Sequence, residues 1–266
     1  MTAAWRFLAL GLALLWLPAC AGAPERAFWG ADARALPGWE RLGEAALTAA
    51  TDPFTWLPAA GAAALQIGGA DEDVADWANE ERPLFGSRDT ADDVSDGLRI
   101  GSYVLYGAAG LAAPAPEDAW LETKAKGFAV GAGTLLATRG ATDGLKAVTD
   151  RERPLDQDDE SFPSGHASMT AAAARLTSDS LTYYDLSRPA EIGSDIALAG
   201  LVLTTSWARL EAGEHHPADV LAGMALGNFL AVFATEAFLA PATEDRLALG
   251  VRPEDDGMVV QLGWRF

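Results

Sequence analysis

Residues 162–176 read FPSGHASMTAAAARL, a Pro-Ser-Gly turn followed by a run of strong helix formers. Ser164 is suited to cap the N-terminus of that helix, and Gly165 lets a ligand approach the backbone. The free amides at a helix N-terminus carry a partial positive charge and attract anions. Because His166 falls in the first turn, this stretch predicts an anion site with an imidazole beside it.

A pair of cations precedes this turn. Lys146 and Arg153 are seven residues apart, a spacing that places both on one helix face and lets them reach one anion. Pro154 is expected to end that helix. On its own, the pair is better explained as two solvated surface side chains. In a protein with a net charge of −19, however, such a pairing needs a reason.

The other two histidines lie further along the chain. Pro217 suits the first turn of a helix over 218–240. His215 and Asp219 are four residues apart, so the carboxylate can bind one imidazole nitrogen, fix the tautomer and leave the other nitrogen as a nucleophile. Adjacent helix residues do not share a face, so His216 is expected on the opposite side.

Taken in order, these clusters resemble the motifs of the type 2 phosphatidic acid phosphatase and vanadium haloperoxidase superfamily, which are Lys-x6-Arg-Pro, Pro-Ser-Gly-His and Ser-Arg-x5-His-x3-Asp. The matching residues are Lys146, Arg153, Pro154, Pro163, Ser164, Gly165, His166, Arg209, His215 and Asp219. Ala208 stands where the family often has serine. The resemblance covers about residues 97–240. It implies a mainly α fold, a helical bundle of the phosphatidic acid phosphatase/haloperoxidase type.

The resemblance also implies a reaction, the metal-independent hydrolysis of phosphate monoesters. The implied phosphate-binding residues are Lys146, Arg153, Ser164, Gly165 and Arg209. His215 is implied as the nucleophile that becomes a phosphohistidine, Asp219 as its orienting carboxylate, and His166 as the general acid. Three cationic side chains take the place of a metal, so no metal or other cofactor is expected. The expected substrates are lipid phosphates, such as phosphatidic acid or isoprenyl pyrophosphates, or a small phosphate ester.

Two other functions remain open at this point. The same residues could hold vanadate as a cofactor, with His215 as its ligand, and oxidise halides with peroxide. The chain could also be a catalytically idle envelope lipoprotein whose acidic stretch 71–96 and C-terminal hairpin serve a partner. The short chain and the expected lipid anchor favour the phosphatase, in which vanadate would only mimic phosphate.

The N-terminus predicts export. Residues 1–19 carry Arg6 and then an apolar run over 7–17, the pattern of a signal peptide. That run is short for a membrane span. The sequence LPAC at 17–20 resembles a lipobox, and Cys20 is the single cysteine of the chain. An alanine follows it, which implies the outer membrane. We expect a lipid-anchored protein on the periplasmic side of a bacterial cell envelope.

Composition limits the remaining possibilities. The chain has 266 residues, half of them hydrophobic, which suits one domain with small appendages. The predicted organisation is a tether with a short helix over 20–50, a helical domain over 51–240 and a β-hairpin over 241–266. A net charge of −19 argues against a broad basic surface for nucleic acid. A single cysteine excludes an intrachain disulfide and a multi-cysteine zinc site.

Apolar stretches rich in Ala and Leu predict the helices. They cover 52–70, 97–113, 127–142, 165–177, 192–208 and 218–240. The charge concentrated in 71–96 predicts a solvated surface segment. Alternating apolar residues from Met258 to Phe266, after an Asp-Gly turn, predict a hairpin packed on the helices. A mean hydropathy of +0.07 favours a bundle that buries its own apolar faces over one embedded in a membrane, although 218–240 could just span one.

Overall fold

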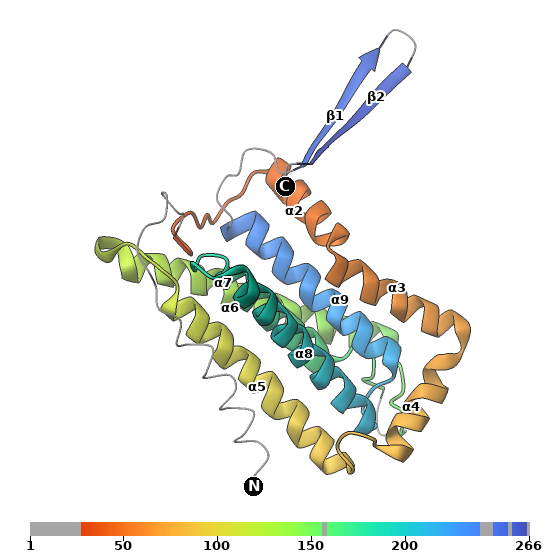
Figure 1. Ribbon diagram of the computed structural model, residues 1–266. Coiled ribbons are helices and arrows are strands. Elements are labelled where there is room, and N and C mark those ends of the chain that lie inside the picture. Colours follow the sequence, from red (N-terminus) through yellow and green to blue (C-terminus); the bar gives the residue numbers. More distant parts are fainter. Residues whose placement is uncertain (1–27, 156–158, 240–246, 255–256, 265–266) are drawn as a thin grey trace.

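The computed structural model describes residues 28–155, 159–239, 247–254 and 257–264, and Figure 1 shows its mainly helical architecture. The helices of the described chain are α2 (Trp39–Thr51), α3 (Pro53–Gly68), α4 (Ala70–Glu81), α5 (Arg88–Ala112), α6 (Trp120–Thr149), α7 (Gly165–Leu181), α8 (Arg188–Glu211) and α9 (Pro217–Ala234). The short turn η1 (Glu117–Ala119) precedes α6, and η2 (Thr235–Leu239) continues α9. The prediction of a mainly α fold is confirmed.

Helix α9 lies at the centre of the bundle. Helices α2, α3, α6 and α7 pack around it, and α5 and α8 pack on α7 (Figure 1). Among the described residues, the segment Pro217–Leu239 is long and apolar enough to cross a membrane by length and composition. Within the fold, 56% of its most apolar window is buried by the surrounding helices, as expected for a core helix.

Helices α7 and α9 touch backbone to backbone. A Cβ atom added at Gly227 would lie 2.0 Å from the Ser168 carbonyl oxygen, and one at Gly223 would lie 2.5 Å from the Ser164 carbonyl oxygen. Only glycine can occupy these two positions without moving the helices apart. Because α7 and α9 begin near this contact, it holds their N-termini together.

Helix α5 starts nine residues earlier than the sequence predicted, at Arg88 instead of residue 97. The Ser87 hydroxyl caps it by accepting the amide of Thr90 at 3.1 Å. The apolar pattern used for the prediction begins only after the charged first turns, so it could not show this start. The extension brings acidic residues of α5 toward the N-termini of α7 and α9.

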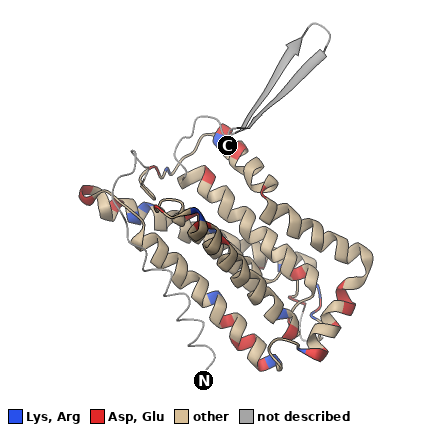
Figure 2. Cartoon of the chain, viewed as in Figure 1, with Lys and Arg blue, Asp and Glu red and all other residues tan. Residues whose placement is uncertain are grey.

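The acidic stretch is therefore not simply a solvated segment. It forms α4 and the first turns of α5, and Figure 2 shows its acidic residues gathered at that end of the bundle. Asp71 is only 4% exposed, and its carboxylate accepts the Ala218 amide at 2.7 Å. The prediction of a solvated segment is wrong at this residue. A count of charges along a sequence carries no information about the tertiary partners that make a buried carboxylate tolerable.

Part of the predicted tether belongs to the core. Trp29 is 1% exposed and packs edge-on against the rings of Tyr106 and Phe128. The ammonium group of Lys124 lies 5.4 Å from the centre of the Trp29 ring and donates to the Gly110 carbonyl oxygen at 2.7 Å. This buried lysine satisfies a carbonyl in the last turn of α5, where a cation is favoured.

Two strands follow the helices. β1 (Leu247–Glu254) and β2 (Gly257–Trp264) pair antiparallel, with Leu247 opposite Trp264. Their side chains are outside the description, so the predicted packing of a hairpin on the helices stays a prediction. The predicted signal peptide over 1–19 and the predicted lipidation site Cys20 also lie outside the described residues.

A buried carboxylate ties the end of α8 to the turn before α5. Glu211 is fully buried and accepts the amides of Leu84 (2.9 Å) and Phe85 (2.8 Å) and the indole NH of Trp207 (2.6 Å). Glu211→Ala would leave these donors without an acceptor, so we expect it to lower the free energy of unfolding by about 3 kcal/mol in urea titrations. The exposed Glu191→Ala serves as the control. Equal stability of the two variants would contradict the assigned role.

Candidate active site

The loop before α9 presents His215 with a defined tautomer. Its ring is 2% exposed, and Nδ1 lies 2.7 Å from the Ser161 carbonyl oxygen. A carbonyl can only accept, so Nδ1 donates its proton and Nε2 keeps a free electron pair. Burial, then the positive charge of Arg209, lowers the pKa of this imidazole well below its usual 6.5, with further contributions from Lys146 and Arg153. His215 is therefore a neutral base at pH 7.

Arg209, at the end of α8, is a buried cation of this site. It is 4% exposed, and its Nη1 donates to the Ser95 hydroxyl at 3.0 Å and pairs with Asp92. Its Nη2 lies 3.1 Å from the Glu214 carboxylate. Its Nε is buried and has no hydrogen-bond partner among the residues that the structure describes. A buried donor of this kind suits an incoming anion.

The other two cations also contact carboxylates. Arg153 pairs with Glu214, which Arg209 shares. Lys146 donates to the Glu160 carbonyl oxygen at 2.6 Å and lies 3.8 Å from its carboxylate. Each predicted phosphate-binding cation is thus held beside an acidic side chain. A bound phosphate must compete with these carboxylates for the same donors.

The seven-residue spacing had suggested that Lys146 and Arg153 share a helix face, and this prediction is wrong. α6 ends at Thr149, and Asp150 adopts a left-handed conformation with φ 42°. The chain therefore leaves the helix before Arg153, which lies in the following loop, and the helix does not run on to Pro154. The convergence of Lys146 and Arg153 on His215 comes from the path of this loop, which periodicity along a helix cannot predict.

The start of α7 places its N-terminal amides at the site. Ser164 is fully buried at the N-cap, and its amide donates to the Asp219 carbonyl oxygen at 2.9 Å. This bond joins the N-terminus of α7 to the first turn of α9. Gly165 is the first residue of α7, and a Cβ there would meet only a Thr142 methyl at 3.7 Å. Ser164 and Gly165 thus lie where the sequence predicted an anion-binding helix start.

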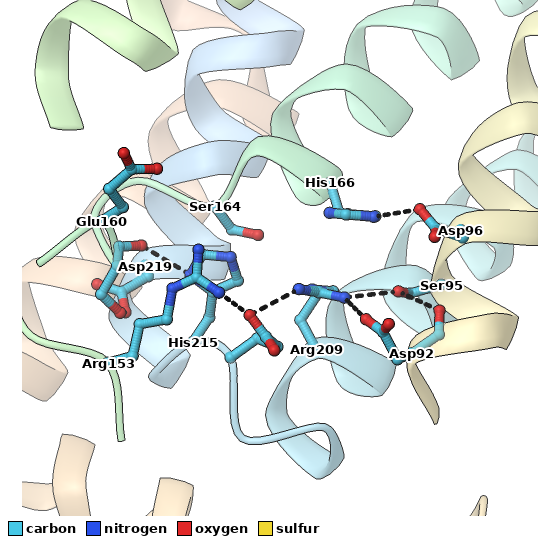
Figure 3. Close-up of polar contacts among 12 residues, drawn as sticks. Asp92, Ser95, Asp96, Arg153, Glu160, Ser164, His166, Arg209, His215 and Asp219 are labelled. Atoms are coloured by element: carbon cyan, nitrogen blue, oxygen red, sulfur yellow. Dashed lines mark hydrogen bonds and ion pairs between the residues drawn. The ribbon is translucent and has the colours of Figure 1, made fainter. Parts of the chain in front are cut away.

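His166 faces α5. Its Nε2 lies 2.9 Å from the Asp96 carboxylate, and Figure 3 shows it across the site from Arg153 and His215. Burial, then the charge of Arg209, lowers the pKa of His166 to about 4. Hydrogen bonds from Arg99, then His166, lower the pKa of Asp96 to about 2. The pair is therefore a neutral imidazole beside an ionised carboxylate at pH 7.

The four-residue spacing had suggested that Asp219 binds the His215 ring, but the carboxylate binds other groups. Its Oδ2 accepts the Ser161 hydroxyl at 2.6 Å and the His216 amide at 2.8 Å, and Oδ1 accepts Arg151 at 2.5 Å. The His216 Nδ1 lies 3.2 Å away, so His216 is not on the opposite side. His215 precedes the helix, which means that helical spacing does not apply to it. The link from Asp219 to His215 runs through Ser161.

Sequence reasoning missed seven charged or hydroxyl-bearing partners of the site. They are Asp71, Asp92, Ser95, Asp96, Arg151, Ser161 and Glu214. One signal was available. Asp92, Ser95, Asp96 and Arg99 recur at intervals of three or four residues, the spacing of one helix face. Ser161 and Arg151 carry no such signal, because loop residues have no fixed period.

The described helices thus form a bundle that brings Arg153, Arg209, two imidazoles and the start of α7 to one site (Figure 3). Lys146 also acts electrostatically on His215. Residues 127–240 match the family model of the PAP2 superfamily. The matched region contains every residue of the three motifs.

One curated relative is similar over the same part of the chain. Decaprenylphosphoryl-5-phosphoribose phosphatase of Mycolicibacterium smegmatis is 36% identical over 137 residues. The alignment covers 48% of this chain and 65% of the relative, so the chain spans slightly less than two thirds of that protein. No solved structure matches the chain significantly.

Proposed function

We propose that the protein is a phosphatase that hydrolyses lipid-linked phosphate monoesters through a phosphohistidine at His215. The observation that carries the proposal is a buried, neutral imidazole whose Nδ1 proton is held by a carbonyl, set among three cationic side chains. An unprotonated Nε2 in a positive environment suits attack on an anionic phosphorus centre. The match of residues 127–240 to the PAP2 superfamily model and the phosphatase name of the relative support the same chemistry.

The cations bind and activate the phosphate. Lys146, Arg153 and Arg209 would donate to the equatorial oxygens together with the amides at the start of α7. Fixed positive groups in a buried site stabilise the charge that develops in the in-line transition state. In the free protein, Asp92 and Glu214 bind the guanidinium groups of Arg209 and Arg153, and the substrate would compete with them for these donors. A doubly charged phosphate would compete better than a singly charged anion.

The two imidazoles have different roles in the proposed reaction, His215 as the nucleophile and His166 as the proton donor and acceptor. The Nε2 electron pair of His215 forms a bond to phosphorus while the ester P–O bond breaks, and the leaving oxygen takes a proton from His166. Neutral His166 then accepts a proton from water, whose oxygen attacks phosphorus and displaces His215. Inorganic phosphate leaves, and both rings return to their starting states. In this scheme Asp219 acts on His215 through Ser161.

Two observations favour a lipid substrate. The relative's name describes a phosphatase for a decaprenyl-linked sugar phosphate. Helix α3 carries no charged residue, and it exposes Phe54 (61%), Leu57 (54%) and Ile67 (88%). Apolar side chains exposed on a charge-free helix suit contact with a membrane surface. We therefore include the membrane among the proposed partners, with a phosphorylated lipid as the substrate.

The proposed location is the periplasmic side of the bacterial outer membrane. The proposal rests on the signal-peptide pattern and on Cys20 within LPAC. Acyl chains on Cys20 would hold the site at the lipid surface, since each buried methylene contributes about 0.8 kcal/mol. The mass of the mature wild-type protein, compared with that of Cys20→Ser, tests for the anchor.

The test of function is phosphate release from a substrate panel. Phosphatidic acid, an isoprenyl pyrophosphate, a prenyl-linked sugar phosphate and a soluble alkyl phosphate are compared, with wild type beside His215→Ala. We expect release from at least one lipid phosphate, inhibition by vanadate as a phosphate mimic, and no need for added metal. Absence of release from every ester would contradict the proposal and favour an idle lipoprotein.

The pH dependence should reflect the low pKa of His166. As general acid it must be protonated, so the kcat/KM of an alkyl phosphate is expected to fall as pH rises through about 4. A bound phosphate dianion favours the protonated ring, so the corresponding limb of kcat should lie at higher pH. Asp96→Asn removes a contact that raises this pKa and should move the kcat/KM limb to lower pH. Limbs that coincide near pH 7 in both proteins would contradict the assignment.

A further inference from the structure

A buried cluster of ion pairs lies next to Ser161, the residue whose carbonyl binds the His215 ring. The Arg151 guanidinium binds two carboxylates, with Nη1 2.5 Å from Asp219 and Nη2 2.5 Å from Asp71. The second oxygen of Asp71 accepts the Ala218 amide at 2.7 Å. Arg151 therefore joins the start of α4 to the start of α9. We call Asp71, Arg151 and Asp219 the Arg151 fork.

Ser161 connects the fork to the imidazole. Its amide donates to the Arg151 carbonyl oxygen at 2.9 Å, and its hydroxyl donates to Asp219 at 2.6 Å. Its own carbonyl accepts the His215 Nδ1 proton at 2.7 Å. Every polar group of this fully buried residue is used. The direction of its carbonyl is consequently fixed by Arg151 and Asp219 together.

We propose that Asp71, Arg151 and Ser161 are positioning residues, which hold the Nδ1 proton of His215 so that Nε2 stays free to attack. The catalytic consequence rests on the proposed function, whereas the tautomer does not. Arg151 occupies an unspecified position within the first motif, and Asp71 lies outside all three motifs. Partners that orient a metal-bound histidine commonly change affinity or activity by about 10- to 100-fold when removed, and we expect an effect of that size here.

Burial explains why the fork is needed. Asp219 is fully buried and Asp71 is 4% exposed, so a paired cation is needed to offset the cost of burying the two carboxylates. Lysine offers one point charge and cannot bridge both carboxylates in the geometry of a guanidinium. In Arg151→Lys, Ser161 keeps its bond to the main-chain carbonyl of residue 151, but the Asp219 carboxylate that accepts its hydroxyl loses the guanidinium that it shares with Asp71. The His215 ring is then free to exchange its proton between Nδ1 and Nε2.

The tautomer can be measured without any substrate. The chain has three histidines, so the full-length protein labelled with 15N-histidine gives a simple long-range 1H–15N spectrum. We expect wild-type His215 to show the pattern of a neutral ring protonated on Nδ1. Arg151→Lys should show a mixture of the two tautomers. A wild-type His215 protonated on Nε2 overturns the proposal, as does an unchanged tautomer in a folded Arg151→Lys.

Arg175→Lys is the matched control. Arg175 on α7 also bridges two carboxylates, Asp52 at 2.7 Å and Asp179 at 2.8 Å, in another part of the bundle. This control loses a comparable fork, so it separates a loss of stability from a loss of positioning. We expect it to lower the thermal midpoint and to keep the wild-type His215 tautomer. If Arg175→Lys shows the same mixture of His215 tautomers as Arg151→Lys, the specific role of Arg151 is overturned.

Kinetics provide the second readout. In Arg151→Lys, formation of the phosphoenzyme should slow by about 10- to 100-fold, while inhibition by inorganic phosphate stays within about threefold, because Lys146, Arg153 and Arg209 are intact. If Arg151→Lys does not fold, Asp71→Asn gives the same test with a smaller change in volume. Equal weakening of phosphate binding and phosphoenzyme formation overturns the positioning role. If the wild-type protein forms no phosphoenzyme, the proposed function is contradicted. The positioning role of Arg151 is then still tested by the His215 tautomer, which is measured without substrate.

Discussion

His215→Ala is expected to abolish turnover, with phosphate release falling by about 10⁴-fold or more. The substitution removes the only group that the proposed mechanism uses as a nucleophile. Brief mixing of wild type with 32P-labelled substrate, followed by denaturation, should trap a phosphoenzyme that is labile in acid and stable in base. The His215→Ala protein should carry no label under the same conditions.

The neighbouring imidazole supplies the control. His216→Asn keeps a side-chain oxygen at the N-cap of α9 and removes the second histidine of the pair. We expect this variant to form the labelled phosphoenzyme. Label that persists in His215→Ala and disappears in His216→Asn would reassign the nucleophile to His216. Label that persists in both variants would exclude the phosphohistidine at this pair.

His166→Asn should reveal the general acid through its dependence on the leaving group. An alkoxide needs a proton to leave, so the phosphoenzyme is expected to form about 10²- to 10⁴-fold more slowly from an alkyl phosphate. p-Nitrophenolate leaves without help, so the rapid release of one equivalent from p-nitrophenyl phosphate should remain close to wild type. Stopped-flow absorbance measures this first turnover.

The second half of the reaction gives an independent check. If His166 also activates water, the phosphoenzyme of His166→Asn should accumulate after the first turnover of the aryl ester, and the steady rate should fall. The two effects together distinguish an acid–base role from a general loss of structure. An equal reduction of the first turnover with both esters would contradict the assignment of His166 as the acid.

The parts of the site that were predictable depend on local chemistry. Ser164 and Gly165 mark the start of α7 through capping preferences that act over a few residues. Pro217 marks the start of α9 in the same way, at the first helical position. These signals place His166 and His215 at two helix starts before any tertiary structure is known. The mainly helical fold follows from the same kind of reasoning.

The parts that were not predictable depend on long-range contacts. Asp71 meets Ala218 across 147 positions, and Asp96 meets His166 across 70. Composition could only describe the acidic stretch as a sum of charges, whereas its tertiary partners decide which charges are buried. The partner of Asp219 was missed for a related reason. A spacing of four residues implies contact only when both residues lie within the helix, and His215 precedes it.

The glycine contact between α7 and α9 determines how the site responds to changes elsewhere. At Gly223 and Gly227, the backbone of α9 lies directly against the backbone of α7, because neither glycine has a side chain to separate the two helices. We expect substitutions of hydrophobic residues elsewhere in the bundle to change this spacing less than a substitution at Gly223 or Gly227 would. The separation of the two reactive rings should therefore be most sensitive to these two small residues, which bear no functional group.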